Sequence, residues 1–297
     1  MGTPEFAVPP LKTLVDNGYD IAAVITAPDK PKGRGQKVTI SAVKEYAQSA
    51  NLPILQPTNL KDPEFIRQLG TYRANLQIVV AFRMLPEVVW QMPELGTFNL
   101  HGSLLPQYRG AAPIHWAIIN GETETGLTTF FLKHEIDTGN IILQEKEAIS
   151  SKDTTGTLYK RLMERGGQLV LKTVQVIENK DYNLTAQRTD QEIKHAPKLF
   201  KENTEIDWHR PAKDIYNFVR GLNPFPSAWT IINNKKYKIH FVEVVDDLNE
   251  GATGEVQTDE KTFVRIQCGQ GKIELKEIQP EVKKRMMIED FLRGNKI

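Results

Sequence analysis

The segment between residues 98 and 113 carries the side chains best suited to chemistry. Asn99 and His101 alternate there with Phe98 and Leu100, so in a β-strand the polar pair points to one face and the apolar pair to the other. Histidine relays protons near neutral pH, and an asparagine amide donates a hydrogen bond to a developing oxyanion. The pair therefore suits proton transfer, although two satisfied polar groups at a strand end would have the same spacing.

A second polar segment, residues 134–139, offers a carboxylate to this pair. Asp137 stands before Thr138 and Gly139, in a turn-like sequence that follows the next apolar run. Beside His101 it would orient the imidazole ring and stabilise the imidazolium. An aspartate before Thr-Gly more commonly binds its own backbone in a turn. The residue types leave both interpretations open.

A basic segment, residues 27–38, offers a different chemistry. It has two glycines and no acid after Asp29, and its cations are Lys30, Lys32, Arg34 and Lys37. Such a segment suits contact with phosphate groups by charge, and its glycine spacing differs from that of a dinucleotide-binding turn. The alternative is a hairpin whose basic side chains are solvated.

The elements that must position these residues follow an α/β pattern. Short apolar runs rich in β-branched residues alternate with segments of helical period, which predicts a doubly wound, mostly parallel sheet. The expected strands are residues 21–26, 52–55, 76–82 and 97–100, with a further pair at 128–132 and 141–145. The expected helices are residues 8–15, 41–50, 63–69 and 86–92. Asn99 and His101 then lie where a parallel strand ends, which is where open α/β sheets bind ligands.

A second, smaller domain is expected after a long helix over residues 153–177. The predicted divisions are a catalytic domain 1–178, a linker 179–199 without helical periodicity, and a C-terminal domain 200–297. The last begins with a helix at 211–221, and short strands are expected at 228–232, 236–245, 262–268 and 272–278, a spacing that suggests a small β-barrel. Its charge is balanced at 16 Lys plus Arg and 16 Asp plus Glu, with basic clusters at 235–238 and 283–285.

The start of the chain departs from this pattern. Gly2-Thr3-Pro4 before a helix is typical of the turn after the first strand of a doubly wound sheet, yet only Met1 precedes it. That strand lies centrally, so its loss would leave two rows of backbone groups unpaired. We therefore expect Met1 to be an internal methionine, and the functional polypeptide to begin several residues earlier with an apolar strand.

Composition and charge argue against several classes of protein. The 297 residues include 38 Lys plus Arg and 37 Asp plus Glu, a net charge of +1, which argues against binding polyanions by bulk charge alone. The single cysteine, Cys268, cannot form a disulfide within the chain, which favours a reducing compartment. No leader or membrane span is recognisable, so a cytoplasmic protein without membrane contact is expected.

Motifs along nearly the whole chain resemble those of a known family. They are Gly2-Thr3-Pro4-Glu5-Phe6, the basic segment from Pro28 to Gly35, Asn99-x-His101-x-Ser103-Leu104-Leu105-Pro106, Arg109-Gly110-Ala111-Ala112-Pro113, Asp137-Thr138-Gly139, Asp153 to Leu158, Ile206-Asp207-Trp208 and Arg220 to Pro226. Together they resemble the 10-formyltetrahydrofolate-dependent formyltransferases, and most closely the members that act on methionyl-tRNA. Phe82-Arg83 stands where the family usually has Tyr-Gly.

The resemblance implies an activity and a site. It implies transfer of a formyl group from 10-formyltetrahydrofolate, the donor substrate, to the α-amine of initiator methionyl-tRNA, which supports translation initiation. The implied catalytic residues are Asn99, His101 and Asp137, and the implied folate-binding residues are Ser103, Leu104, Leu105 and Pro106. The cations Lys30, Lys32, Arg34 and Lys37 would then reach the acceptor end of the tRNA. It also implies a C-terminal barrel of oligonucleotide-binding type, and we expect no metal and a monomeric enzyme.

Other functions share parts of this pattern. Formyl transfer to an amino sugar nucleotide or another small amine would use the same three catalytic residues, but it would not explain the basic segment together with a barrel-type second domain. A hydrolase that releases formate would use them with water as the nucleophile. A tRNA-binding module with an inactive site is a non-enzymatic alternative, and the presence of Asn99, His101 and Asp137 argues against it.

Overall fold

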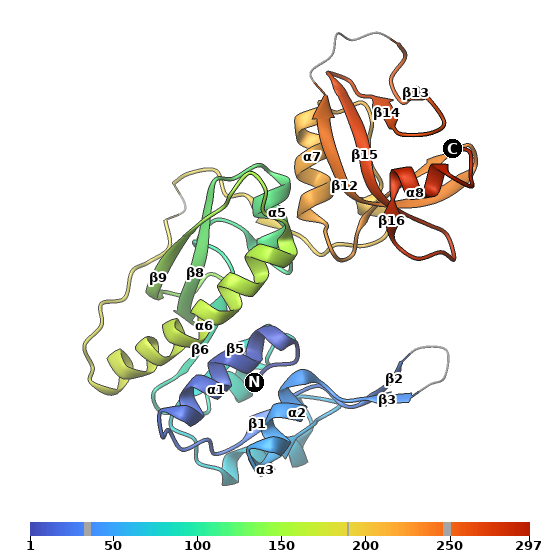
Figure 1. Cartoon of the computed structure of the whole chain (residues 1–297). Coiled ribbons are helices and arrows are strands. Elements are labelled where there is room, and N and C mark those ends of the chain that lie inside the picture. Colours follow the sequence, from blue (N-terminus) through green and yellow to red (C-terminus); the bar gives the residue numbers. More distant parts are fainter. Residues whose placement is uncertain (33–36, 189, 246–250) are drawn as a thin grey trace. The chain divides into compact units, whose positions relative to one another are not determined.

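The computed structural model describes residues 1–32, 37–188, 190–245 and 251–297 (Figure 1). The chain packs into two units, each assembled from separate segments. Unit 1 consists of Met1–Arg109, Gly126–Glu147 and Tyr159–Lys194, and unit 2 of Gly110–Thr125, Ala148–Leu158 and His195–Ile297. Packing therefore divides the chain differently from the contiguous domains 1–178 and 200–297, which remain a sequence-based prediction.

Unit 1 is built on the predicted doubly wound, mostly parallel sheet. Strand β1 (Val24–Ile25) runs parallel to β4 (Ile54–Leu55), and β5 (Gln77–Val80) runs parallel to β6 (Thr97–His101). The antiparallel β8 (Glu124–Phe131) follows β6 in the order β5-β6-β8-β9, with β9 at Ile141–Ala148. The buried apolar residues of the parallel strands are Val24, Ile25, Leu55, Val79, Val80, Phe98 and Leu100, whereas Ile54 and Ile78 are partly exposed.

The first two residues lie between the two parallel pairs. The Met1 carbonyl accepts a hydrogen bond from Val80 N at 2.9 Å, and Gly2 N donates to Ile25 O at 3.0 Å. Gly2 also forms a parallel bridge with Val80. The position expected for the first strand is thus central, between β1 and β5, and two residues of the chain occupy it.

The helices of unit 1 begin at the signals that the sequence offers. Ser41 caps α2 (Ala42–Ser49) by accepting a hydrogen bond from Lys44 N, and Asp62 caps α3 (Pro63–Thr71) with Pro63 in the first turn. The other elements of this part of the chain are η1 (Glu5–Ala7), α1 (Val8–Asp16), β2 (Lys30–Lys32), β3 (Lys37–Thr39), α4 (Glu87–Trp90) and α6 (Thr155–Glu178). Leu162, Leu169 and Val170 of α6 are at most 1% exposed, which confirms the predicted helical stripe.

Unit 2 contains the predicted antiparallel sheet. Its strands are β11 (Ala228–Ile232), β12 (Lys235–Val245), β13 (Val256–Thr258), β14 (Val264–Gln267), β15 (Lys272–Pro280) and β16 (Met286–Met287). They pair in the order β11-β12-β15-β14-β13, with β16 beside β15, which confirms a curled antiparallel sheet of barrel type. The remaining elements are β7 (Arg109–Gly110), α5 (Pro113–Ile119), β10 (His195–Ala196), η2 (Glu202–Thr204), α7 (Ala212–Gly221) and α8 (Ile288–Leu292).

The core of unit 2 lies between this sheet and its helices. Ile239, Ile266, Ile273 and Leu275 of the sheet and Ile215 of α7 are at most 1% exposed. Within the described ranges, no helix is both long and apolar enough to cross a membrane.

Candidate active site

Strand β6 places Asn99 and His101 by simple alternation. Phe98 and Leu100 are 0% and 3% exposed in the apolar interior, so the residues between them face the opposite side of the sheet. The rings of His101 and Phe130 meet edge to face at 6.5 Å between centroids. The sheet therefore holds both polar side chains on one face, at the end of a parallel strand.

The imidazole of His101 is fixed by one hydrogen bond. Its Nε2 lies 2.9 Å from the carbonyl oxygen of Tyr108, and a carbonyl only accepts hydrogen bonds, so Nε2 carries a proton. In the neutral ring the lone pair is then on Nδ1. This Nδ1 lies 3.9 Å from Oδ2 of Asp137, which is beyond hydrogen-bonding range but close enough for the carboxylate to stabilise a charge on the ring.

Asp137 combines the two roles that the sequence left open. Its side chain, 13% exposed, faces His101, and its backbone adopts a left-handed turn conformation with φ +56°. Thr138 Oγ1 donates to the carbonyl of Glu135 within the same turn. A Cβ on Gly139 would lie only 1.6 Å from the carbonyl oxygen of Phe131, so the turn packs directly against the end of β8. The turn therefore holds the Asp137 carboxylate in a defined position.

The amide of Asn99 is available to a ligand. Its side chain is partly exposed, and among the described residues none forms a hydrogen bond with its amide. An amide donor so placed beside an imidazole fits a carbonyl or formyl oxygen that gains negative charge during reaction. This donor set suits a formyl donor, and within the described ranges no group of three or more His, Cys, Asp or Glu residues is arranged to hold a metal ion.

The segment expected to contact the folate is held from inside. Ser103 is fully buried and its hydroxyl donates to the Gln107 carbonyl at 2.6 Å, while Leu105 packs in the core beside Phe130. Leu104 and Pro106 are partly exposed. Contact of this segment with folate remains a prediction, and of its four side chains those of Leu104 and Pro106 are the more accessible.

Two polar side chains that sequence reasoning missed anchor that segment. Thr128 Oγ1 donates to the Ser103 carbonyl and accepts from Leu105 N, at 2.6 and 3.1 Å. Gln144 Nε2 donates to the Leu105 carbonyl at 2.9 Å. Thr128 and Gln144 lie within strands, and nothing in the sequence around them indicated that they anchor this segment.

The basic segment forms a hairpin. Lys30 and Lys32 lie in β2 and Lys37 in β3, which pair antiparallel, and the Lys30 side chain is exposed; Arg34 lies outside the described residues. The carboxylate of Asp29 is bound by Lys44 Nζ at 2.5 Å and by Gln56. These hydrogen bonds, the one from Lys44 foremost, lower the pKa of Asp29. The only acid in the segment is thus bound by two side chains from outside it.

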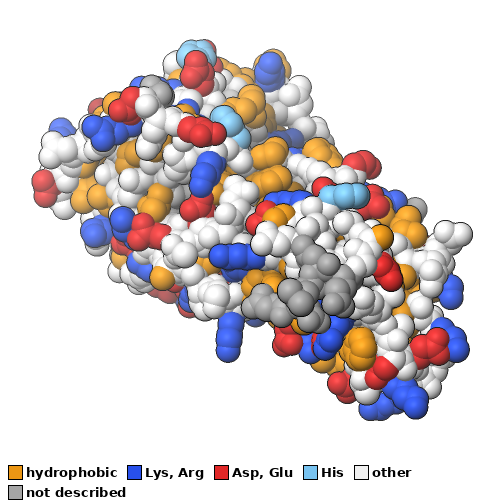
Figure 2. Space-filling view, turned by 90° about the horizontal axis from the view of Figure 1, so that it is seen from above, with side chains coloured by type: hydrophobic (Ala, Val, Ile, Leu, Met, Phe, Trp, Pro, Cys, Tyr) orange, Lys and Arg blue, Asp and Glu red, His pale blue; other side chains and the backbone are white. Residues whose placement is uncertain are grey.

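Positive and negative side chains are interspersed on the face of the molecule in Figure 2, as the balanced composition predicts.

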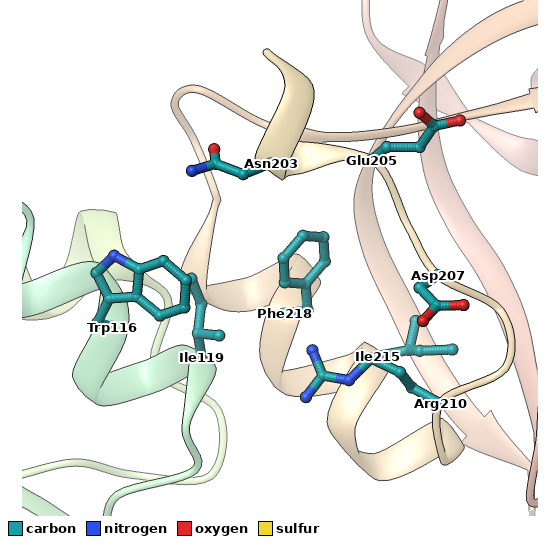
Figure 3. Close-up of a pocket in the computed structure, with 8 residues that line it drawn as sticks. All are labelled: Trp116, Ile119, Asn203, Glu205, Asp207, Arg210, Ile215 and Phe218. Carbon is teal, nitrogen blue, oxygen red and sulfur yellow. The ribbon is translucent and has the colours of Figure 1, made fainter. Parts of the chain in front are cut away.

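A hollow of about 240 Å³ in unit 2 contains none of the predicted site residues (Figure 3). Trp116 and Phe218 line it, and its Arg210 pairs with Asp214 at 3.4 Å.

Gln187 and Arg109 are further residues of the site without a predicted role. Gln187 Nε2 donates to the carbonyls of Asp137 and Gly139 at 2.8 and 2.9 Å. Its Oε1 accepts two hydrogen bonds from Arg109, from Nε at 2.9 Å and Nη2 at 2.6 Å. Gln187 belongs to the segment 179–199 expected to be a linker, which here contacts the turn that holds Asp137.

Comparison with known proteins identifies both parts of the chain. The family model "Formyl transferase" matches residues 1–174, and "Formyl transferase, C-terminal domain" matches residues 198–296. The methionyl-tRNA formyltransferase of Bacteroides fragilis is 50% identical over 302 residues, covering 99% of this chain and 93% of that protein. That of Phocaeicola vulgatus is 53% identical over 304 residues, covering 99% and 94%.

Solved structures share the fold at lower identity. The N-formyltransferase from Helicobacter canadensis, in complex with folinic acid and dTDP-3-aminofucose, has a TM-score of 0.68 at 23% identity, covering 94% of this chain and 97% of that one. HypX from Aquifex aeolicus in complex with tetrahydrofolic acid has a TM-score of 0.59 at 20% identity, covering 84% of this chain and 43% of that one.

Proposed function

Because the chain belongs to the formyl transferase family, we propose that it transfers the formyl group of 10-formyltetrahydrofolate to the α-amine of initiator methionyl-tRNA in the cytoplasm. The observation that carries the proposal is the apposition of His101 and Asp137, 3.9 Å apart, beside the accessible amide of Asn99. The substrate assignment is supported by relatives about 50% identical over 99% of this chain. Folate, when bound, supplies the activated formyl group.

The first task of the site is to stabilise negative charge on the formyl oxygen. When the amine nitrogen adds to the formyl carbon, the C–O double bond opens and the electron pair moves to oxygen. The Asn99 amide, which no described residue binds, donates to that oxygen. This contact is stronger for the oxyanion than for the neutral formyl group, so it lowers the barrier rather than only tightening binding.

The second task is to move one proton. The amine nitrogen becomes cationic as its bond to carbon forms, and the lone pair on Nδ1 of His101 can accept its proton, since Nε2 is held by the Tyr108 carbonyl. The imidazolium then lies beside the Asp137 carboxylate and also stabilises the nearby oxyanion. Return of this proton to N10 of the folate lets the C–N10 bond break, and the proton count balances.

The basic hairpin and the C-terminal sheet are proposed to contact the tRNA. Lys30, Lys32, Arg34 and Lys37 would bind phosphates of the acceptor end. A balanced net charge is compatible with this, because local cations rather than the overall field would provide the contacts. Leu104 and Pro106 would lie against the folate.

The test is a formyl-transfer assay that compares methionyl-tRNA, free methionine and an amino sugar nucleotide as acceptors. We expect transfer to methionyl-tRNA, and reductions of at least about 100-fold for His101→Ala, Asp137→Asn and Asn99→Ala. His134→Ala is the matched control, because this histidine lies in the same loop but is exposed and pairs with Glu87. Near-normal turnover of folded His101→Ala would refute the mechanism, and preference for the sugar nucleotide would refute the acceptor.

A further inference from the structure

Gln187 uses its whole hydrogen-bonding capacity to connect Arg109 to the turn of Asp137. A glutamine amide has two N–H donors and two acceptor lone pairs. Both donors of Gln187 are directed to backbone carbonyls, those of Asp137 and Gly139. Its oxygen accepts the two donors from Arg109. The amide is therefore saturated, and every bond it makes lies within the active-site region.

Arg109 fixes which way round this amide stands. A flipped amide would place Oε1 against the carbonyls of Asp137 and Gly139, and its N–H groups against the guanidinium of Arg109. Acceptor would then face acceptor and donor would face donor, so the flipped state is strongly unfavourable. The guanidinium thus keeps both Gln187 N–H groups directed at the turn.

The turn requires such support because its backbone is strained. Asp137 is a residue with a Cβ held at φ +56°, a conformation that costs about 1–3 kcal/mol and persists only where the surroundings determine it. Tyr108, whose carbonyl holds His101, has φ +59°, and its N–H donates to the Lys194 carbonyl at 2.6 Å. Asp137 and Tyr108, the two residues whose oxygen atoms face the imidazole nitrogens, are therefore both strained, and they are bound by Gln187 and Lys194 respectively.

We propose that Gln187 is a positioning residue that sets the separation of Asp137 from His101. The carboxylate is 3.9 Å from Nδ1, at a distance where a small displacement of the turn decides whether it can support the imidazolium. Misplacement by about 1 Å can lower a rate about 100-fold. Without the Gln187 bonds the turn relaxes toward less strained backbone, and the carboxylate moves from the ring. The inference rests on the proposed function, because it assumes that Asp137 acts through His101.

The first test replaces the amide but keeps the side-chain length. In formyl transfer to methionyl-tRNA, we expect Gln187→Met to lower kcat at least about tenfold while KM for both substrates changes less than about twofold. Gln91→Met is the control, because it makes the same change in an exposed side chain whose amide donates to the Glu87 carboxylate at 2.6 Å. It should keep kcat within about twofold. Unchanged kcat in Gln187→Met, or an equal loss in the control, would overturn the proposal.

The second test asks whether Gln187 acts through Asp137. A double variant, Gln187→Met with Asp137→Asn, should be no slower than Asp137→Asn alone, because there is no longer a carboxylate to position. If the two losses multiply, Gln187 acts by another route and the proposal fails.

A third variant, Gln187→Glu, keeps the shape of the side chain and its attraction to Arg109. The new carboxylate oxygen lies against the two carbonyls of the turn and cannot donate to them, so kcat should fall. Thermal melting should show that the variant is folded. A wild-type kcat would show that the side chain at position 187 only fills space. If instead Asp137→Asn itself leaves turnover normal, it is the catalytic assignment of Asp137 in the proposed function that fails. That result is distinguishable from failure of Gln187 alone.

Discussion

An apolar strand added before Met1 should stabilise unit 1 substantially. The gap between β1 and β5 contains a cavity of about 470 Å³. Its lining includes Ala23 and Ile25 on one side and Leu76 and Ile78 on the other, with residues of α1 and α6. In a parallel ladder successive residues bond to alternate sides, and the pairings of β1 and β5 turn the N–H groups of Ile25 and Ile78 toward this gap.

The amino group of Met1 adds a penalty that the extension would remove. Burial lowers the pKa of this amine to about 5 from its usual 8.0. Between these values the unfolded chain binds the proton and the folded chain does not, so stability rises with pH from about 5 to 8. At pH 7 the cost to folding is about 1.4 kcal/mol. An amide bond at this position is uncharged and has no such titration.

The expected gain follows from these terms. For each added aliphatic residue, burial contributes about 1.5–3 kcal/mol and ordering of backbone and side chain costs a similar amount. Two contributions then remain as net stabilisation. New hydrogen bonds to the groups that line the gap contribute about 1 kcal/mol each, and the cost of burying the Met1 amine is removed. A gain of at least about 3 kcal/mol corresponds to a rise in Tm of about 6–12 °C for a unit of this size.

The assay compares three chains by thermal melting between pH 5 and 8. The first is the chain itself, the second carries Val-Ile-Val-Ile before Met1, and the third carries Gly-Ser-Gly-Ser there as the control. The apolar extension should melt highest and lose the pH slope assigned to the amine. The Gly-Ser-Gly-Ser chain should also lose this pH dependence of Tm, but its Tm should otherwise rise little. Equal Tm values for all three chains, with the same pH dependence, would refute the location of the gap.

Two further predictions concern the turn and the hairpin. Gly139→Ala should lower kcat at least about 100-fold with a smaller effect on Tm, because the new Cβ would lie 1.6 Å from the Phe131 carbonyl oxygen and force the Asp137 turn to move; wild-type kcat would contradict the close packing. Lys32→Ala with Arg34→Ala should weaken use of methionyl-tRNA and reduce the dependence of its KM on salt, with the KM for folate unchanged. Loss of folate affinity instead would assign this segment to the donor site.

Much of the sheet was predictable, and the shortfalls have physical reasons. The expected strand 21–26 is reduced to Val24–Ile25, because β4 flanks it on one side and only Gly2 on the other. Helix α5 (Pro113–Ile119) is not among the predicted elements, although its sequence contains helical signals. Pro113 in the first turn and the buried Ile114, Ala117 and Ile118 were the available signals.

The candidate site was predictable where it depends on short-range periodicity. The two-residue spacing of Asn99 and His101 determines that they share a face of any strand. Spacing does not determine the role of Asp137, because a turn residue and a catalytic carboxylate look alike in sequence. In the structure Asp137 has the backbone of a turn residue, with φ +56°, and its Oδ2 faces His101, so the two interpretations are compatible.

The support of that carboxylate follows no such rule. Gln187 is 50 positions from Asp137 and 78 from Arg109, so no local spacing connects them. The segment that contains Gln187 has no helical period, because individual hydrogen bonds to two loops order it. Tyr108 N donates to the Lys194 carbonyl, and Gln187 Nε2 donates to the Asp137 carbonyl. A connecting segment that is ordered by such contacts looks like a linker in sequence and behaves as part of the site in structure. The predicted boundary at residue 178 is therefore a division of sequence pattern, whereas the proposed site is assembled from residues on both sides of it.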